Sequence, residues 1–172
     1  GRVAASPPSP TPSIPGMLQL GCDFEVDTCA WSDTAPDWYP WTRTSGGTSS
    51  YDTGPSGDHT TGSGYYLFTR AYHNGARYNT LHQLESPRFS LQQDATLSFF
   101  YHMYGSHMGS LSVQAYINET GWSTLWSTTG NKGTDWLDAA VVLPASTTQV
   151  RLNGRTGSGL HSDMALDDVS FS

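Results

Sequence analysis

Carboxylates are the side chains of this sequence best suited to chemistry, because Ca²⁺ takes about six to eight oxygen ligands, several of them carboxylate. The acidic residues of interest are spread along the chain, at Asp23, Glu25, Asp27, Asp58, Asp167 and Asp168. If a fold gathered them without a cation, they would repel one another. Our hypothesis is therefore a structural calcium site, with sodium as an alternative occupant, formed by Glu25, Asp27, Asp58 and one of Asp167 or Asp168.

The same carboxylates could instead cap loops or pair with arginines. The arginines available for Glu25 and the last two aspartates are Arg77, Arg151 and Arg155. Alternation along the last predicted strand places Asp167 on the same face as Val169 and Phe171, which favours Asp167 over Asp168 as the inward ligand. A bulge in that strand would exchange the two.

Cys22 and Cys29 are the only two cysteines, and six residues separate them. This spacing does not match the C-x-x-C pairs of zinc and redox sites. We therefore predict a disulfide that closes a short loop and stabilises the fold by about 2–3 kcal/mol on the chain-entropy model. A disulfide requires an oxidising compartment, which indicates an extracellular location.

Motifs for catalysis are missing from the sequence, which has no G-x-S-x-G elbow, H-E-x-x-H helix or phosphate-binding glycine loop. We therefore expect no enzymatic activity. Among the six histidines, zinc could be bound where His102 and His107 share one stretch, or where His161 lies near Asp163. The simpler expectation is that His59 and His102 form hydrogen bonds or pack beside tyrosines, and that the other four lie on the surface.

Asn118 begins an N-glycosylation sequon that ends at Thr120. It follows directly after a predicted strand, where an exposed turn would admit a glycan. We expect Asn118 to be glycosylated in an extracellular protein.

Composition favours an extracellular all-β domain, because charged residues make up only 13% of the chain. The formal net charge of −7 would repel nucleic acid and anionic membrane surfaces. No stretch approaches the roughly 20 apolar residues that span a bilayer. No N-terminal leader is evident either, so we expect any signal peptide or anchor to lie outside this segment of a longer protein.

The chain has two regions that differ in composition and in hydrophobic pattern. Five prolines fall within residues 1–16 and predict an extended, polyproline-like tether, so we assign residues 1–20 to a linker and 21–172 to one domain. In the domain, short apolar runs alternate with turn residues, which is typical of many short strands. The clearest strands are predicted at 65–72, 78–85, 96–104, 110–117, 124–128, 135–143, 149–153 and 164–171.

Alternation within these strands predicts a two-sheet antiparallel β-sandwich. Leu97, Phe99, Tyr101 and Met103 occupy every second position of one strand, so they should share one face. That face should enter a core between two sheets, since a sheet must bury its apolar side against another layer.

Several blocks in order resemble the MAM domain, the module named after meprin, the A5 neuropilin antigen and receptor tyrosine phosphatase mu. The blocks are CDFE and CAW within 22–31, PSGDHT and GYYL within 55–67, LESP at 84–87, FFYHMYG at 99–105, GSLSV at 109–113, LWS, GNKG and Trp136 within 125–136, and ALDDVS at 165–170. The resemblance implies a jelly-roll sandwich, in which the first and last strands commonly meet, and no catalysis by the module. Related jelly rolls are similar in carrying a calcium site.

One departure from the family pattern concerns cysteines. The family usually has four, but Thr96 stands where the third is expected, and its partner beyond the last strand is missing as well. We therefore expect the last strand to lack a covalent tie.

The resemblance implies a non-catalytic extracellular module of a larger secreted or membrane-anchored protein. Its partner in cell adhesion or receptor assembly would be another protein or a second copy of the chain. A carbohydrate-binding jelly roll is the first alternative, for which Trp38, Trp41, Trp122 and Trp126 would have to be exposed in a groove. The second alternative is an ancillary domain of a protease or phosphatase.

Overall fold

A computed structural model of the chain describes residues 20–172, so the predicted linker lies outside the described residues except for Leu20. Within this range the chain forms ten strands and no helix, and all strand pairs are antiparallel within two five-stranded sheets. In spatial order the first sheet contains β1 (Ser32–Asp33), β4 (Leu81–Glu85), β9 (Thr147–Arg155), β6 (Ser110–Ile117) and β7 (Gly121–Thr129). The second contains β2 (Thr42–Ser45), β3 (Tyr65–Phe68), β10 (Met164–Phe171), β5 (Ala95–Met103) and β8 (Leu137–Leu143). The predicted all-β jelly-roll β-sandwich is confirmed.

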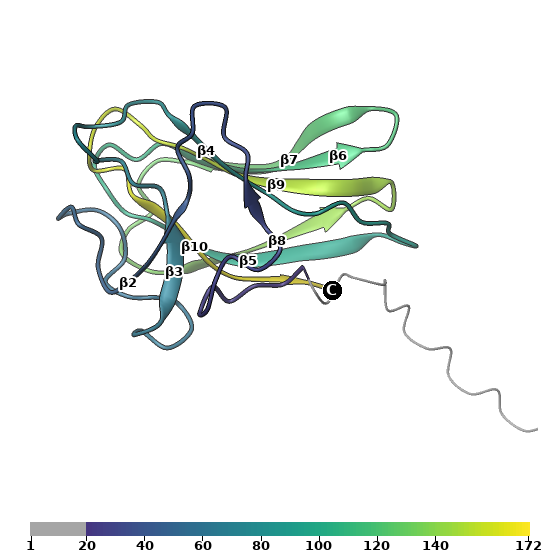
Figure 1. Ribbon diagram of the computed structural model, residues 1–172, viewed down its shortest axis with the longest axis horizontal. Helices are drawn as coiled ribbons and strands as arrows, with labels where there is room; N and C mark the ends of the chain where they lie inside the picture. The colour runs from purple at the N-terminus through teal and green to yellow at the C-terminus, as the bar shows by residue number, and fades with distance from the viewer. Residues whose placement is uncertain (1–19) are drawn as a thin grey trace, which may run out of the picture.

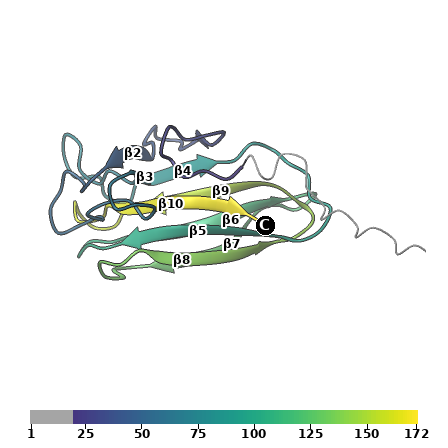
Figure 2. The same cartoon turned by 90° about the horizontal axis from the view of Figure 1, so that it is seen from below.

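The two sheets form the two layers of the sandwich. Figure 1 shows β6, β7 and β9 in the upper layer and β5, β8 and β10 in the lower layer. Figure 2 shows the second sheet face-on, with β10 between β3 and β5. The C-terminus lies beside the start of the described chain, where main-chain hydrogen bonds run in both directions between Cys22 and Val169. The first and last segments of the domain are therefore neighbours.

Alternating side chains build the core between the sheets. Phe99 and Leu97 of β5 are at most 1% exposed, and Leu111 and Val113 of β6 are fully buried opposite them. Burying one such side chain contributes about 1.5–3 kcal/mol to folding. The period of two in the sequence therefore selects the inward faces that hold the sheets together.

Two strands of the structure were not predicted. β1 and β2 are short and largely polar, so no apolar alternation marks them. They exist because β4 and β3 already offer a sheet edge with free hydrogen-bonding groups. The predicted strands at 110–117 and 164–171 have the observed bounds, whereas the strand predicted at 65–72 ends earlier, at Phe68.

The end of β10 is joined to β5 by main-chain hydrogen bonds. The amide of Thr96 donates to the carbonyl of Ser172 at 2.8 Å, and the amide of Ser172 donates back at 3.0 Å. Backbone pairing thus connects the C-terminal residue to the position where the family pattern would have a cysteine.

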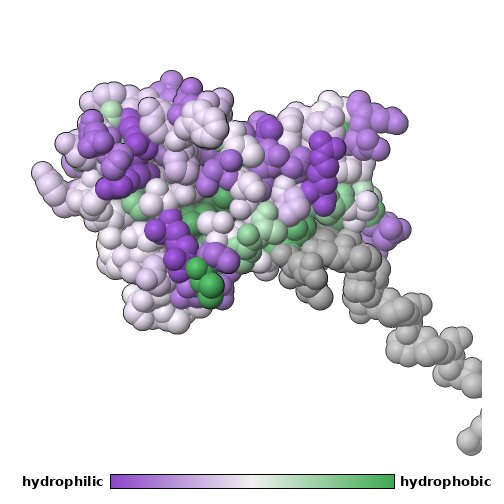
Figure 3. Space-filling view, viewed as in Figure 1, coloured by the Kyte–Doolittle hydropathy of each residue, from purple (hydrophilic) through white to green (hydrophobic). Residues whose placement is uncertain are grey.

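The surface facing the viewer in Figure 3 is largely hydrophilic, with apolar residues gathered in small areas of its lower half. Exposed large apolar side chains do occur singly, the most exposed being Trp38 at 90%. Over residues 20–172, no helix has the length and apolarity needed to cross a membrane.

Candidate functional site

A disulfide between Cys22 and Cys29 organises the N-terminal loop, as predicted. Cys22 also pairs with Val169 of β10, and the indole nitrogen of Trp31 donates to the carbonyl of Leu20 at 2.7 Å. Trp31 is only 3% exposed and stacks on Phe171. These contacts hold the loop of residues 23–28 against the last strand, where its carboxylates can meet those of other segments.

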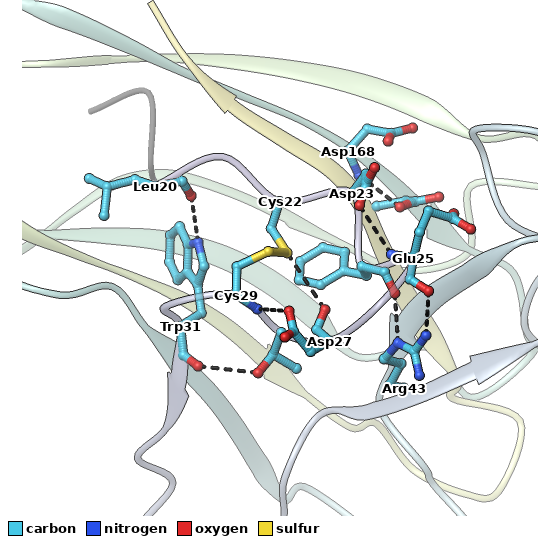
Figure 4. The surroundings of a disulfide bond; sticks show 12 residues. Leu20, Cys22, Asp23, Glu25, Asp27, Cys29, Trp31, Arg43 and Asp168 are labelled. Carbon is cyan, nitrogen blue, oxygen red and sulfur yellow. Dashed lines mark hydrogen bonds between the residues drawn. A yellow bond between two sulfur atoms is a disulfide. The ribbon is translucent and has the colours of Figure 1, made fainter. Parts of the chain in front are cut away.

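Arg43 of β2 fixes the main chain of this loop. Its guanidinium donates to the carbonyls of Phe24 and Glu25, each at 2.6 Å (Figure 4). It also lies 3.8 Å from the ring centroid of Tyr65. Because both donors go to carbonyl oxygens, the Glu25 carboxylate is left free of this arginine. This contact could not be predicted from the sequence, since β2 has no apolar pattern.

Glu25 and Asp58 meet above Gly64. A Cβ built on Gly64 would collide with oxygens of both carboxylates, so a larger residue at this position would displace the pair. Burial and the neighbouring Asp58 raise the pKa of Glu25. The pKa of Asp58 is lowered despite its burial, because the amide of Gly64 and the Glu25 carboxyl stabilise its charged form. The two carboxyl groups are therefore close enough for each to shift the pKa of the other.

Only one of the two carboxylate oxygens of Asp58 accepts hydrogen bonds. Its Oδ1 accepts from the amide of Gly64 at 3.0 Å and from that of Thr61 at 3.3 Å. Its Oδ2 is buried without a hydrogen-bond partner, and the residue is 4% exposed. A buried acceptor of this kind is rare unless water or an ion meets it. The free oxygen of Asp58, the Glu25 carboxylate and the glycine cradle fit an oxygen-ligated cation.

Asp167 lies beneath the loop that follows Asp58. It is fully buried and accepts hydrogen bonds from the amides of His59 and Asp168, each at 2.9 Å. Burial, followed by the charge of Asp168, raises the pKa of Asp167 to about 7. Asp167 is thus a third carboxyl group whose charged form lacks a compensating positive charge.

A β-bulge in β10 determines the directions in which the side chains of Asp167 and Asp168 point. The pairing of β10 with β5 shifts register between Asp167 and Ser170, and Asp168 has a left-handed φ of 49°. The expectation that Asp167 shares a face with Val169 is wrong, because Asp167 pairs with Phe100, whose ring is stacked by His59 outside the core. Asp167 is nevertheless the more buried of the two.

Asp168 is contacted by two residues of the loop before β3. His59 Nδ1 lies 2.6 Å from a carboxylate oxygen of Asp168, and the hydroxyl of Thr60 donates to the same carboxylate at 2.8 Å. His59 also stacks on Phe100 with ring centroids 3.5 Å apart. This matches the loop-fixing role expected for His59.

Comparison with known proteins identifies the family. The sequence matches the family described as "MAM domain, meprin/A5/mu" over residues 22–172. This chain belongs to the MAM family. It is 34% identical over 169 residues to Neuropilin-1a of Danio rerio and 33% identical over 183 residues to MAM domain-containing glycosylphosphatidylinositol anchor protein 2 of Homo sapiens, covering 92% and 93% of this chain. This MAM domain spans only 18% of the length of each relative.

Solved structures support the fold of the MAM domain. The K2 cleaved adhesin domain of Lys-gingipain superposes with a TM-score of 0.67 at 17% identity, covering 88% of this chain and 98% of that one. A carbohydrate-binding module, TmCBM61 in complex with β-1,4-galactotriose, superposes with a TM-score of 0.53 at 8% identity, covering 83% and 87%. At these identities the likeness concerns the sandwich alone.

Glu25, Asp58 and Asp167 form what we call the acidic cluster. Other predicted ligands of the MAM domain lie apart from it. Asp27 is exposed, and its carboxylate accepts from the amide of Cys29 at 2.8 Å, on the disulfide side of the loop and away from Asp168 (Figure 4). Asp23 lies close enough for its charge to raise the pKa of Glu25. Over residues 20–172, no group of three or more His, Cys, Asp or Glu side chains has the spacing of a metal site.

The arginines considered as partners for the acidic residues are engaged elsewhere. Arg151 pairs with Glu85 at 2.7 Å, Arg77 lies over the ring of Tyr39, and Arg155 donates to a main-chain carbonyl. Arg43 lies beside the acidic carboxylates, but its guanidinium donates to main-chain carbonyls and not to a carboxylate.

The histidines correct one expectation. His82 is not a surface residue: it is fully buried on β4, because it faces the same side of the strand as Leu84. His102 is 1% exposed and its Nε2 lies 3.0 Å from the carbonyl of Thr134. His107 and His161 stack with centroids 5.0 Å apart.

The tryptophans offer little exposed platform for a sugar. Trp41 is 3% exposed and Trp126 packs against the core. One face of Trp122 is covered by Arg151 at 3.7 Å. Trp38 alone of the four is largely exposed, and it lies on a loop.

Proposed function

We propose that this MAM domain is a non-catalytic interaction module of a larger extracellular protein, secreted or membrane-anchored, that mediates adhesion or receptor assembly. The family match over residues 22–172 carries the proposal. Relatives named as a neuropilin and as a glycosylphosphatidylinositol anchor protein support a position outside the cell, as does the disulfide.

The proposal includes a structural calcium ion at the end of the sandwich where β3 begins, beside the middle of β10. Glu25 and Asp58 would hold it directly, and Asp167 would favour it through its charge. The support is the partnerless Oδ2 of Asp58 together with the cradle above Gly64. When bound, the cation would neutralise carboxylates from three distant segments and so join the N-terminal loop, the loop before β3 and the last strand.

Thermal unfolding with calcium and with chelator tests this site. At calcium about a hundred times above the dissociation constant, binding adds about 2.7 kcal/mol to the free energy of unfolding, or about 5–10 °C in Tm for a domain of this size. Asp58→Asn and Gly64→Ala should lose the shift. Gly47→Ala is the matched control, since nothing lies closer than 3.8 Å to its Cβ position. An unchanged Tm for the unaltered domain would rule the calcium site out.

Sedimentation velocity over a concentration series, with millimolar calcium and then with chelator, tests the mode of interaction. A dimer that forms only with calcium would support homophilic adhesion and connect it to the acidic cluster. A monomer in both conditions would exclude self-association of the isolated domain and direct the search to a different protein. Because each copy of the chain has a formal net charge of −7, two copies repel one another unless a cation lies between them.

A further inference from the structure

A second candidate site lies on the outer face of the first sheet, away from the acidic cluster. Here β4, β9 and β6 form a depression of about 240 Å³. Its polar lining consists of Gln83, Ser110, Ser112, Gln114, Asn153 and Arg155. A depression of this size is slightly smaller than the roughly 300–1,000 Å³ of drug-sized pockets, so it suits a ligand of one or two rings.

Strand register lines these side chains up in rows across the three strands. Gln83 pairs with Asn153, which pairs with Ser112 on its other side. In the next row Arg155 lies between Leu81 and Ser110. The alternate positions, such as Leu84 and Leu152, face the core. The rows therefore belong to the outward face, where side chains at the centre of a sheet would normally meet solvent.

Two of these outward side chains are nevertheless almost completely buried. Gln83 is 7% exposed and Asn153 is 8% exposed. Thr34, which follows β1, donates to Gln83 Oε1 at 3.0 Å and so fixes the Gln83 side chain. Gln114, which also lines the depression, is paired with Arg151 in the next row. The sheet face is thus hollowed around Asn153.

Asn153, one of the residues that line this hollow, has an unused acceptor. Its Nδ2 donates to Gln114 Oε1 at 2.8 Å, which fixes the orientation of the amide. Its Oδ1 is buried and has no hydrogen-bond partner. Buried acceptors are nearly always paired, so a donor from a bound molecule is the natural complement of this atom.

The lining excludes several kinds of partner. None of its residues is a carboxylate, so a cation has no counter-charge there. β4, β9 and β6 are each paired on both sides, so a peptide cannot add to them as a strand. What the face offers is amides, hydroxyls and one guanidinium, Arg155, whose side chain is exposed.

We propose that this depression binds a glycan through the hydroxyls of one or two sugar residues. A sugar hydroxyl donates to Asn153 Oδ1 and accepts from the Arg155 guanidinium, while Ser112 and Gln114 contact neighbouring hydroxyls. Each hydroxyl can donate and accept at once, which matches a lining of mixed polarity. The site goes beyond the proposed protein interaction and lies on the opposite sheet from Asp58, so the two can be tested separately.

Titration of the ¹⁵N-labelled domain with methyl glycosides of galactose, mannose, xylose and N-acetylglucosamine tests the proposal. At least one glycoside should shift the side-chain amide signals of Asn153, Gln83 and Gln114 and saturate by about 50 mM, as expected for a millimolar dissociation constant. Asn153→Ala and Gln114→Ala should each weaken binding at least tenfold. Gln93→Ala, an exposed glutamine on a loop, should leave binding unchanged.

Two outcomes would overturn the proposal. One is that none of the four glycosides shifts these signals by that concentration. The other is that sodium sulfate produces the same shifts as the sugars, because this would assign the depression to an anion on Arg155. Amide dispersion in each variant spectrum reports whether the fold is intact, and Ser112→Ala provides a milder second variant if Asn153→Ala unfolds.

Discussion

His82 should make the domain sensitive to mild acid. The ring is fully buried on β4, with its centroid 6.2 Å from that of Tyr39 and 6.4 Å from that of Trp41. Neither ring nitrogen has a hydrogen-bond partner. Burial, reinforced by the charge of Arg77, lowers the pKa of His82 from 6.5 to about 4. The folded protein therefore keeps this ring neutral under conditions in which the unfolded chain protonates it.

The size of the effect follows from that pKa difference. Between its unfolded pKa of 6.5 and its folded pKa of about 4, His82 binds a proton in the unfolded state only, so the free energy of unfolding falls as the pH falls through this window. Each pKa unit is worth about 1.4 kcal/mol. The loss over the whole window is about 3 kcal/mol, and the stabilisation is fully present above pH 6.5.

Urea denaturation monitored by tryptophan fluorescence at steps from pH 7.5 to 4 measures this loss. His82→Leu removes the titrating ring, so its unfolding free energy should rise by about 3 kcal/mol relative to the unaltered domain as the pH falls to 4. His73→Gln, at an exposed histidine, should follow the unaltered domain. Parallel curves for His82→Leu and the unaltered domain would refute the assignment.

Three further predictions concern the disulfide, the core and the glycan. Replacing Cys22 and Cys29 together by serine should lower the free energy of unfolding by about 2–3 kcal/mol, from the closed loop of this size; an unchanged urea midpoint would contradict it. Leu84→Ala, at a fully buried side chain, should cost about 2–5 kcal/mol, whereas Val142→Ala, at a side chain 63% exposed, should cost less than about 0.5 kcal/mol. Asn118 is exposed in the turn after β6, so protein secreted from eukaryotic cells should lose mass on amidase treatment, and Asn118→Gln should abolish that loss.

Much of the fold could be predicted because its strands carry their own pattern. The strand at 110–117 alternates apolar and polar residues and has the predicted bounds. β2 could not be predicted, since its Thr-Arg-Thr-Ser sequence forms a strand only beside β3. His82 could have been recognised as buried, because it alternates with Gln83 and shares the face of Leu84.

The candidate site was predictable only in its residue types. Carboxylates at Glu25, Asp58 and Asp167 are evident in the sequence, and the family resemblance implies that the first and last strands meet. The bulge after Asp167 and the left-handed φ of Asp168 depend on how β10 is paired with β5. A one-residue shift in pairing exchanges the faces of a strand, so alternation alone could not orient the two aspartates.

The sequence by itself determined the class of the protein: a period of two in its apolar residues, two cysteines at a loop-closing distance, and ordered MAM blocks. These are local properties, each read within a few neighbouring residues. Tertiary structure decided which distant groups meet, including Glu25 with Asp58 above Gly64 and Asn153 with Gln114 on the outer sheet. Such meetings follow from strand order and register, which are set by the packing of the whole core and not by any single segment.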